Sequence, residues 1–244
     1  MNLLLDLGNT RLKWALRDDG NDRASGAVGW HEDVPGTLAD AWAGHAPRAA
    51  FAASVVDAAR EALVAASVAR AFGLAPRWLR TPAAACGVVN AYAEPQRLGV
   101  DRFLAMVAAR ADGFAPCVLA GVGTALTLDA LAADGRHLGG LIAPGPRLMR
   151  ESLLGATARV QADHAGRVVE AADNTTDAVT SGCALAAVAL IERFVARMAP
   201  RLGGTPALRL GGGDAAMLLP LLAQPAQLAH DGVLHGLAVW AAAQ

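Results

Sequence analysis

Cysteine is scarce in this chain of 244 residues, and its three cysteines, Cys86, Cys117 and Cys183, form no C-x-x-C pair. An odd number of cysteines without such a pair argues against a disulfide framework and against a zinc knuckle. The six histidines include no H-E-x-x-H motif. We therefore expect no dedicated transition-metal chemistry.

An excess of one charge is also lacking, because 21 basic residues face 22 acidic ones. The five tryptophans are scattered rather than interleaved with basic residues, so neither a polyanion-binding surface nor a base-stacking platform is expected. The best apolar stretch, residues 182–191, ends at Glu192 and is shorter than the roughly 18 to 20 residues of a membrane helix. The first residues do not resemble a signal peptide. We expect a cytoplasmic protein with no nucleic-acid or membrane partner.

Two common catalytic motifs are missing. The chain has no G-x-x-x-x-G-K-[ST] sequence, which excludes an ordinary P-loop NTPase, and no G-x-S-x-G sequence, which argues against an α/β-hydrolase. A hydrophobic content of 54% with 18% charged residues is typical of a globular protein with a sizeable core. The length allows one large domain or two of ordinary size.

The N-terminal segment predicts strand, turn and strand. Residues 2–5 form a short, largely apolar run, residues 6–10 contain Gly and Asn, and residues 11–17 carry apolar side chains in alternation at Leu12, Trp14 and Leu16. A turn over residues 18–21 and a third strand over residues 24–30 follow. Helical patterns over residues 57–72 and 100–111 enclose an extended segment at 76–80. This alternation predicts an α/β fold.

The same pattern begins again near Pro116. Residues 117–135 match residues 3–20 in outline, with an apolar strand, a turn containing Gly and Thr, an alternating strand and an acidic turn with Gly. A strand at 137–142, a long helix at 176–198, a strand at 207–210 and a helix from about 232 follow. We predict two domains that open with the same hairpin, residues 1–115 and 116–244, with a cleft between them.

The two glycine turns predict phosphate binding, because concave arrays of backbone N–H groups hold anions. In the first turn, Asp6 could hold a hydrated Mg²⁺, while Thr10 and Lys13, the only lysine of the chain, could contact phosphates. The alternative is that these residues only satisfy a β-turn. The second turn, at residues 121–124, favours the functional interpretation.

The sequence Val100-Asp101-Arg102 opens a predicted helix. Adjacent helical residues do not face each other, so Asp101 could accept a hydroxyl proton while Arg102 binds a carboxylate. Favourable interaction of a carboxylate with the helix N-terminus is the alternative explanation for Asp101.

A glycine run, Gly211-Gly212-Gly213-Asp214, lies between a predicted strand and a predicted helix. Its bare backbone could line the pocket of a nucleotide base. With Ala216 and Asp231 the run also fits the outline of a dinucleotide fingerprint. That alternative is weak, because few residues remain after the run for further βαβ units.

Taken together, these motifs resemble the type III pantothenate kinases, members of the actin, sugar kinase and Hsp70 ATPase superfamily. The resemblance covers nearly the whole chain, and it implies that the two domains, residues 1–115 and 116–244, are ribonuclease-H-like. Residues Asp6 to Thr10 resemble the family's first phosphate motif, Gly99 to Arg102 its pantothenate motif, and Gly123 to Asp129 its second phosphate motif. Further matches are Gly139-Gly140, Pro144-Gly145, Asn174-Thr175 and Gly212-Gly213-Asp214.

The resemblance implies site residues. Those expected to contact ATP are Asp6, Leu7, Gly8, Asn9, Thr10, Arg11, Leu12, Lys13 and Thr124. Those expected to contact pantothenate are Tyr92, Gly99, Val100, Asp101, Arg102, Thr175 and Thr176. Asp101 would be the general base, Asp6 would hold Mg²⁺ with ATP, and Thr175 or Thr176 would reach the site from the neighbouring subunit of a homodimer.

Two positions depart from the family pattern. Gly121 stands where an Asp commonly helps to hold a monovalent cation, K⁺ or NH₄⁺, which leaves Asp129 as a weaker or displaced ligand. Gly211 stands where a Thr is usual. The implied activity is phosphorylation of pantothenate to 4'-phosphopantothenate, the first step towards coenzyme A. A nucleotide-gated regulator on the same fold, or a kinase of another small hydroxy-carboxylate, are the alternatives.

Overall fold

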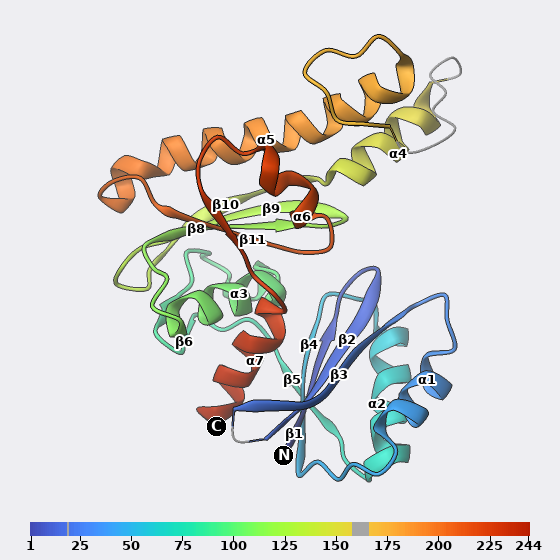
Figure 1. The fold of residues 1–244 in the computed structure, drawn as a ribbon. Helices are drawn as coiled ribbons and strands as arrows, with labels where there is room; N and C mark the ends of the chain where they lie inside the picture. The colour runs from blue at the N-terminus through green and yellow to red at the C-terminus, as the bar shows by residue number, and fades with distance from the viewer. Residues whose placement is uncertain (19, 158–165) are drawn as a thin grey trace. The chain divides into compact units, whose positions relative to one another are not determined.

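The computed structural model describes residues 1–18, 20–157 and 166–244, so Asp19 of the predicted turn lies outside it. The chain divides into two compact units (Figure 1). One contains Met1–Gly113 together with Gly232–Gln244, and the other contains Phe114–Asp231.

The first unit is built on a five-stranded sheet of order β3-β2-β1-β4-β5. Its strands are β1 (Asn2–Leu7), β2 (Arg11–Asp18), β3 (Asn21–Gly29), β4 (Ala49–Ser54) and β5 (Pro76–Leu79). The first three strands pair antiparallel, while β4 is parallel to β1 and β5 is parallel to β4. Alternate side chains of β1 therefore enter cores on opposite faces of the sheet.

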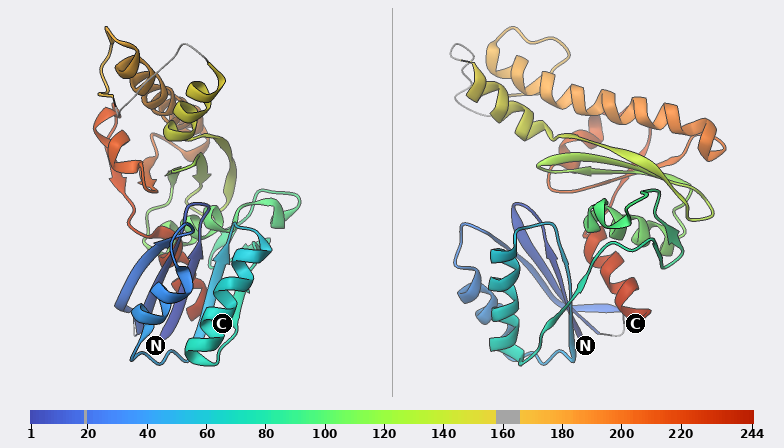
Figure 2. Two further views of the ribbon diagram at one scale, coloured as in Figure 1. Left: turned by 90° about the vertical axis from the view of Figure 1, so that its right-hand side faces the viewer. Right: turned by 180° about the vertical axis from the view of Figure 1, so that it is seen from behind.

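Helices cover both faces of this sheet (Figure 2). On one face, α1 (Val34–Trp42) and α2 (Ala58–Phe72) pack on Leu3, Leu5 and Leu7. On the other face, α3 (Val100–Ala111) and the C-terminal α7 (Gly232–Ala242) pack on Leu4. Asp57 is the N-cap of α2, because its carboxylate accepts a hydrogen bond from the N–H of Arg60 at 3.0 Å.

The second unit repeats this sheet. Its order is β10-β9-β8-β11-β12, and the strand directions match those of the first sheet. The strands are β8 (Cys117–Val122), β9 (Ala125–Leu131), β10 (His137–Pro144), β11 (Ala207–Gly211) and β12 (Ala226–Leu228). The internal repeat predicted from the two hairpins is thus present in the structure.

The longest helix, α5 (Thr175–Leu202), covers one face of the second sheet, and α4 (Pro146–Ala156) packs beside it (Figure 1). By length and composition alone α5 could cross a membrane, although the sequence suggested no such segment. Half of its apolar 18-residue window is buried inside the protein. Val188 and Ile191 belong to the core that α5 forms with β8 and β9, and this packing accounts for its hydrophobicity.

The C-terminal helix differs from the predicted domain assignment. The sequence placed residues 116–244 in one domain, but α7 belongs to the first unit, where it packs along α3. Gly236 permits this packing, because a Cβ there would collide with the backbone of Leu104. Helices α1 and α4 and strand β4 are absent from the sequence prediction. The short elements are β6 (Ala84–Ala85), β7 (Val88–Val89), α6 (Ala215–Leu218) and two 3₁₀ helices, Pro95–Arg97 and Leu219–Leu221.

The contact between α3, α7 and the first sheet predicts a matched pair of leucine variants. Leu104 is fully buried in this contact, whereas Leu63 on α2 is 38% exposed. Leu104→Ala should lower the free energy of unfolding by about 2 to 5 kcal/mol, because it leaves a cavity in the core. Leu63→Ala should cost about 1 kcal/mol or less. Urea unfolding of both variants measures the difference, and equal costs would contradict the packing described.

Candidate functional site

The first glycine hairpin joins β1 to β2. At its turn, the N–H of Gly8 donates to the carbonyl oxygen of Arg11 at 3.2 Å. Asp6 and Lys13 lie directly across from each other in the ladder, so their side chains share one face of the sheet. Asn9 and Thr10 at the tip are exposed. The hairpin thus presents one carboxylate, one ammonium and an exposed backbone turn.

Two residues of this predicted ATP-binding segment do not present their side chains. Leu7 and Leu12 are both fully buried in the core formed with α1 and α2. Only their backbone groups remain for contact with a ligand. The sequence resemblance carried over a continuous segment, but the pleat of the strands turns alternate side chains inward.

The first turn of α3 lies on the same face of the sheet as Asp6 and Lys13. Ala53 of β4 is the ladder partner of Asp6, and it shares an apolar cluster with Val100 at the beginning of α3. Val100 is 6% exposed and anchors the helix in this cluster. Asp101 follows it and is half-buried, with its Oδ1 accepting from the backbone N–H of Arg102 at 2.9 Å. One unit therefore brings the hairpin and the acidic helix start to one face of its sheet.

Arg102 and Tyr92 form a pair beside this helix start. The Arg102 guanidinium lies 6.0 Å from the centre of the Tyr92 ring, and its Nη1 donates to the tyrosine hydroxyl at 3.2 Å. Arg102 is only 5% exposed. A guanidinium held in place by a ring binds carboxylates with defined geometry.

Asn90 holds the loop that carries Tyr92, and the sequence analysis missed it. Its side chain accepts from the Tyr92 N–H at 3.0 Å and donates to the carbonyl oxygen of Pro95 at 3.1 Å. The buried Thr81 hydroxyl donates to the carbonyl oxygen of Leu98 at 2.7 Å, which fixes the approach to Gly99. Neither residue belongs to a predicted motif: Asn90 contacts residues two and five positions away, and Thr81 contacts one 17 positions away.

The second glycine hairpin, between β8 and β9, is contacted by two further glycine motifs, Pro144-Gly145 and Gly212-Gly213. The N–H of Gly145 donates to the carbonyl oxygen of Thr124 at 2.9 Å, and the N–H of Asp214 donates to that of Val122 at 3.1 Å. A Cβ on Gly145 would collide with the carbonyl of Gly123, and one on Gly212 with the backbone of Val122. Gly212 also has a φ of +97°, which disfavours other residues. These motifs therefore support the turn that carries Thr124.

The predicted cation ligand Asp129 is paired with a histidine. Asp129 is 3% exposed, and its Oδ1 lies 2.9 Å from Nε2 of His137. At position 121, a Cβ would lie 2.5 Å from the Thr127 hydroxyl, so this hydroxyl occupies the space that an Asp there would enter. One expected carboxylate is thus absent and the other is engaged. These residues do not fit a monovalent cation.

Thr175 and Thr176 form the first turn of α5, where Thr175 is exposed and Thr176 is half-buried. Thr175 lines a cavity of about 600 Å³ at the start of the helix. The other residues lining this cavity are Leu153, Ala172, Asp173, Asn174, Ala178, Val179, Gly182 and Cys183.

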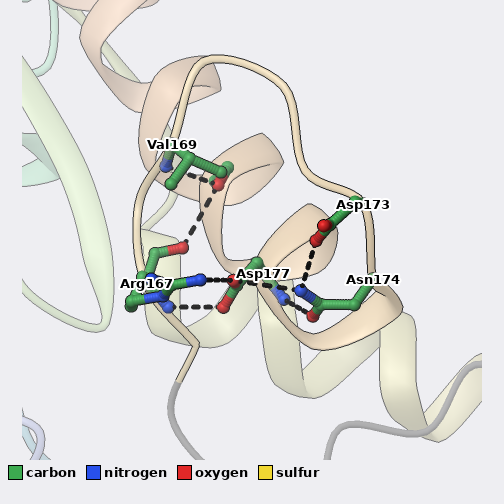
Figure 3. Close-up of polar contacts among 6 residues, drawn as sticks. Arg167, Val169, Asp173, Asn174 and Asp177 are labelled. Atoms are coloured by element: carbon green, nitrogen blue, oxygen red, sulfur yellow. Dashed lines mark hydrogen bonds and ion pairs between the residues drawn. The ribbon is translucent and has the colours of Figure 1, made fainter.

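Asp177 ties the preceding loop to this turn (Figure 3). Its carboxylate accepts from the Arg167 N–H at 2.7 Å, from the Arg167 guanidinium at 3.2 Å and from the Asn174 amide at 3.1 Å. Asn174 in turn accepts from the N–H of Asp177 at 2.9 Å and caps α5. The hydrogen bonds from Arg167 and then from Asn174 lower the pKa of Asp177 below its usual 3.8. The Ser181 hydroxyl accepts from the N–H of Val169 at 3.0 Å and extends the attachment.

Sequence comparison finds relatives over nearly the whole chain. The family model described as type III pantothenate kinase matches residues 2–197. A protein named type III pantothenate kinase from Xanthomonas campestris pv. campestris (strain 8004) is 46% identical over 239 residues, which cover 98% of this chain and 96% of that protein. One of the same name from Laribacter hongkongensis (strain HLHK9) is 43% identical over 239 residues, with 98% and 97% covered.

Solved structures share the fold at low sequence identity. The activator of the 2-hydroxyisocaproyl-CoA dehydratase from Clostridium difficile, solved with bound ADPNP, has a TM-score of 0.53 at 12% identity and covers 98% of this chain and 92% of its own. ROK hexokinase from Thermus thermophilus has a TM-score of 0.50 at 16% identity, with 99% and 98% covered. The predicted α/β fold of actin-like and sugar kinase ATPases, with two ribonuclease-H-like domains, is thereby confirmed.

The attachment at Asp177 predicts a pH-dependent stability. Because folding lowers the pKa of this carboxyl, its contribution is present above its unfolded value of 3.8 and is lost as the pH falls through the lowered folded value. Asp177→Asn should therefore reduce the melting temperature at pH 7, and this difference from the unmodified protein should shrink as the pH falls below 3.8. Glu170→Gln, at an exposed position of the same loop, is the control. It should change neither the melting temperature at pH 7 nor its dependence on pH. A difference that is constant with pH would contradict the assignment.

Proposed function

The chain belongs to the type III pantothenate kinase family and phosphorylates pantothenate in the synthesis of coenzyme A, and we propose that it transfers the γ-phosphoryl group of ATP to the primary hydroxyl. The product is 4'-phosphopantothenate. One observation supports this most directly: the first unit brings the Asp6 to Lys13 hairpin and the first turn of α3 to the same face of its sheet. The hairpin that we propose to bind phosphate thus shares a face with a carboxylate that is suited to accept a proton from an alcohol.

Asp101 is the general base in this proposal. It accepts the proton of the attacking hydroxyl as the new phosphoester bond forms, while the bond between the γ-phosphorus and the bridging oxygen of ADP breaks. A hydrogen bond from the Arg102 N–H to Oδ1 of Asp101 orients this carboxylate. Positioning and charge neutralisation supply most of the catalysis in phosphoryl transfer, so one positioned carboxylate is sufficient.

ATP is bound by backbone groups of Leu7 to Leu12 and by the side chains of Thr10, Lys13 and Thr124. Gly212 to Asp214 lie at the adenosine side. Asp6 is suited to hold Mg²⁺ that arrives with ATP, because this ion prefers one or two carboxylates together with phosphate oxygens. When bound, the ion neutralises charge on the phosphates.

Pantothenate is bound through its carboxylate and through contacts with the protein backbone. Arg102 pairs with the carboxylate, Tyr92 lies beside the acceptor, and Gly99 and Val100 line it with their backbone. The stacked, nearly buried guanidinium supports this role. Thr175 and Thr176 complete the acceptor site from the second copy of a homodimer. The proposed location of the enzyme is the cytoplasm.

Measurement of ADP release with and without pantothenate tests the function. Release that requires pantothenate, with 4'-phosphopantothenate identified by mass spectrometry, is the expected result. Pantothenate methyl ester should be a poor acceptor, because it cannot pair with the Arg102 guanidinium. Binding of ATP without turnover in the presence of pantothenate would instead indicate a nucleotide-gated regulator.

Removing the proposed base should slow the reaction while preserving the fold. Asp101→Asn should lower kcat by about 10² to 10⁴-fold, the usual contribution of a positioned general base. Asp112→Asn, at the other end of α3, is the matched control and should keep normal turnover. Steady-state kinetics and a melting curve for each variant are the measurements. A normal kcat in Asp101→Asn would exclude the residue from proton transfer.

Monovalent cations should not activate this enzyme. Gly121 supplies no carboxylate and Asp129 is paired with His137, so K⁺ and NH₄⁺ lack their expected ligands. Rates measured in sodium buffer should stay the same when potassium or ammonium chloride is added at constant ionic strength. A large increase with potassium, but not with additional sodium, would contradict this interpretation.

A further inference from the structure

We propose that Trp30 is a positioning residue that fixes the orientation of the phosphate-binding turn at Gly8. Trp30 itself touches neither ATP nor the acceptor in this proposal. The inference rests on the proposed binding of ATP at this turn, and it assigns the turn's geometry to a side chain outside every motif.

Trp30 holds both sides of the turn. It follows β3 directly, and its backbone N–H lies 3.4 Å from the carbonyl oxygen of Thr10, which it contacts as a donor. Its indole Nε1–H donates to the carbonyl oxygen of Gly8 at 2.8 Å, across 22 residues of sequence. Two carbonyls on either side of Asn9 are therefore fixed by one residue.

The direction of these carbonyls determines where the turn's N–H groups point. In a trans peptide the C=O and the following N–H point in opposite directions. When the Gly8 carbonyl is held on the indole, the N–H of Asn9 is directed away from Trp30, towards the exposed tip of the hairpin. An anion bound at that tip meets an N–H that is already oriented, so less free energy is spent on ordering the turn.

The indole ring is also held by a contact with α2. The guanidinium of Arg60 on α2 lies 5.3 Å from the centre of the Trp30 ring, and its Nη1 is 3.2 Å from Oδ2 of Asp57. This stacking restricts the ring to the orientation in which Nε1 faces Gly8. The first turn is thereby connected to the beginning of α2.

The internal repeat gives independent support. Gly145 follows β10 as Trp30 follows β3, and its N–H donates to the Thr124 carbonyl as that of Trp30 does to Thr10. In the second hairpin, Gly145 approaches so closely that a Cβ would collide with the Gly123 carbonyl. The equivalent position thus closes one turn by direct backbone approach and the other through an indole N–H.

Trp30→Phe tests the proposal, because it keeps an aromatic ring but removes the donor. The dissociation constant of a non-hydrolysable ATP analogue and the KM for ATP should both rise about threefold to tenfold, as expected for one net hydrogen bond. The KM for pantothenate should stay unchanged, and kcat should fall less than the affinity for ATP. A general loss of structure would not produce this separation.

Trp78→Phe is the matched control, since Arg80 stacks on Trp78 at 5.8 Å in a similar arrangement on β5. It should leave the nucleotide affinity and both KM values unchanged. Unchanged affinity in a folded Trp30→Phe protein would overturn the proposal, and so would an equal loss in both variants.

The analogue-binding measurement needs no acceptor, so it separates two failures. A wild-type protein that binds no nucleotide would refute the proposed ATP site, whereas normal wild-type binding with an unchanged variant would refute only the role of Trp30. If Trp30→Phe fails to fold, Arg60→Met removes the stacked charge instead. That variant should weaken analogue binding in the same direction, and unchanged binding would overturn the proposal.

Discussion

Hydrogen bonds to the carbonyl groups at the tip of a hairpin are the interactions on which this site depends. Each sheet ends in such a tip, and in each the residue after the third strand donates its N–H to the turn. A short turn with few side chains has no core of its own to fix its peptide planes. Donors from outside the hairpin must therefore orient the N–H groups that are proposed to face a phosphate.

Glycine has different tasks in the two turns. Gly145 and Gly212 are required because neighbouring backbone lies where their Cβ atoms would be. Because these glycines have no side chain, three segments of chain can pack around Thr124. At Gly8 the carbonyl oxygen instead accepts from a side chain, the indole N–H of Trp30. The same topology thus supports its two turns with backbone contact in one unit and a tryptophan in the other.

The residues around Gly121 leave the expected cation ligands absent or engaged. With Gly at position 121, the Thr127 hydroxyl fills the adjacent space, and Asp129 pairs with His137 instead of facing a bound ion. A buried carboxylate needs a polar partner, and Nε2 of His137 lies 2.9 Å from this one. The second hairpin therefore resembles the family's phosphate motif in outline, while the residues at positions 121 and 129 do not fit the expected cation.

The sequence by itself determined the α/β class, the repeated hairpins and the identity of the acidic helix start, because strand alternation, glycine turns and helix periodicity are local patterns. Only the tertiary structure decided that α7 joins the first unit, that Leu7 and Leu12 face the core, and which residues anchor the site. Asn90, Asp177 and Trp30 act across 5 to 22 residues of sequence. Such contacts depend on how strands and loops pack in space, and no spacing along the chain encodes them.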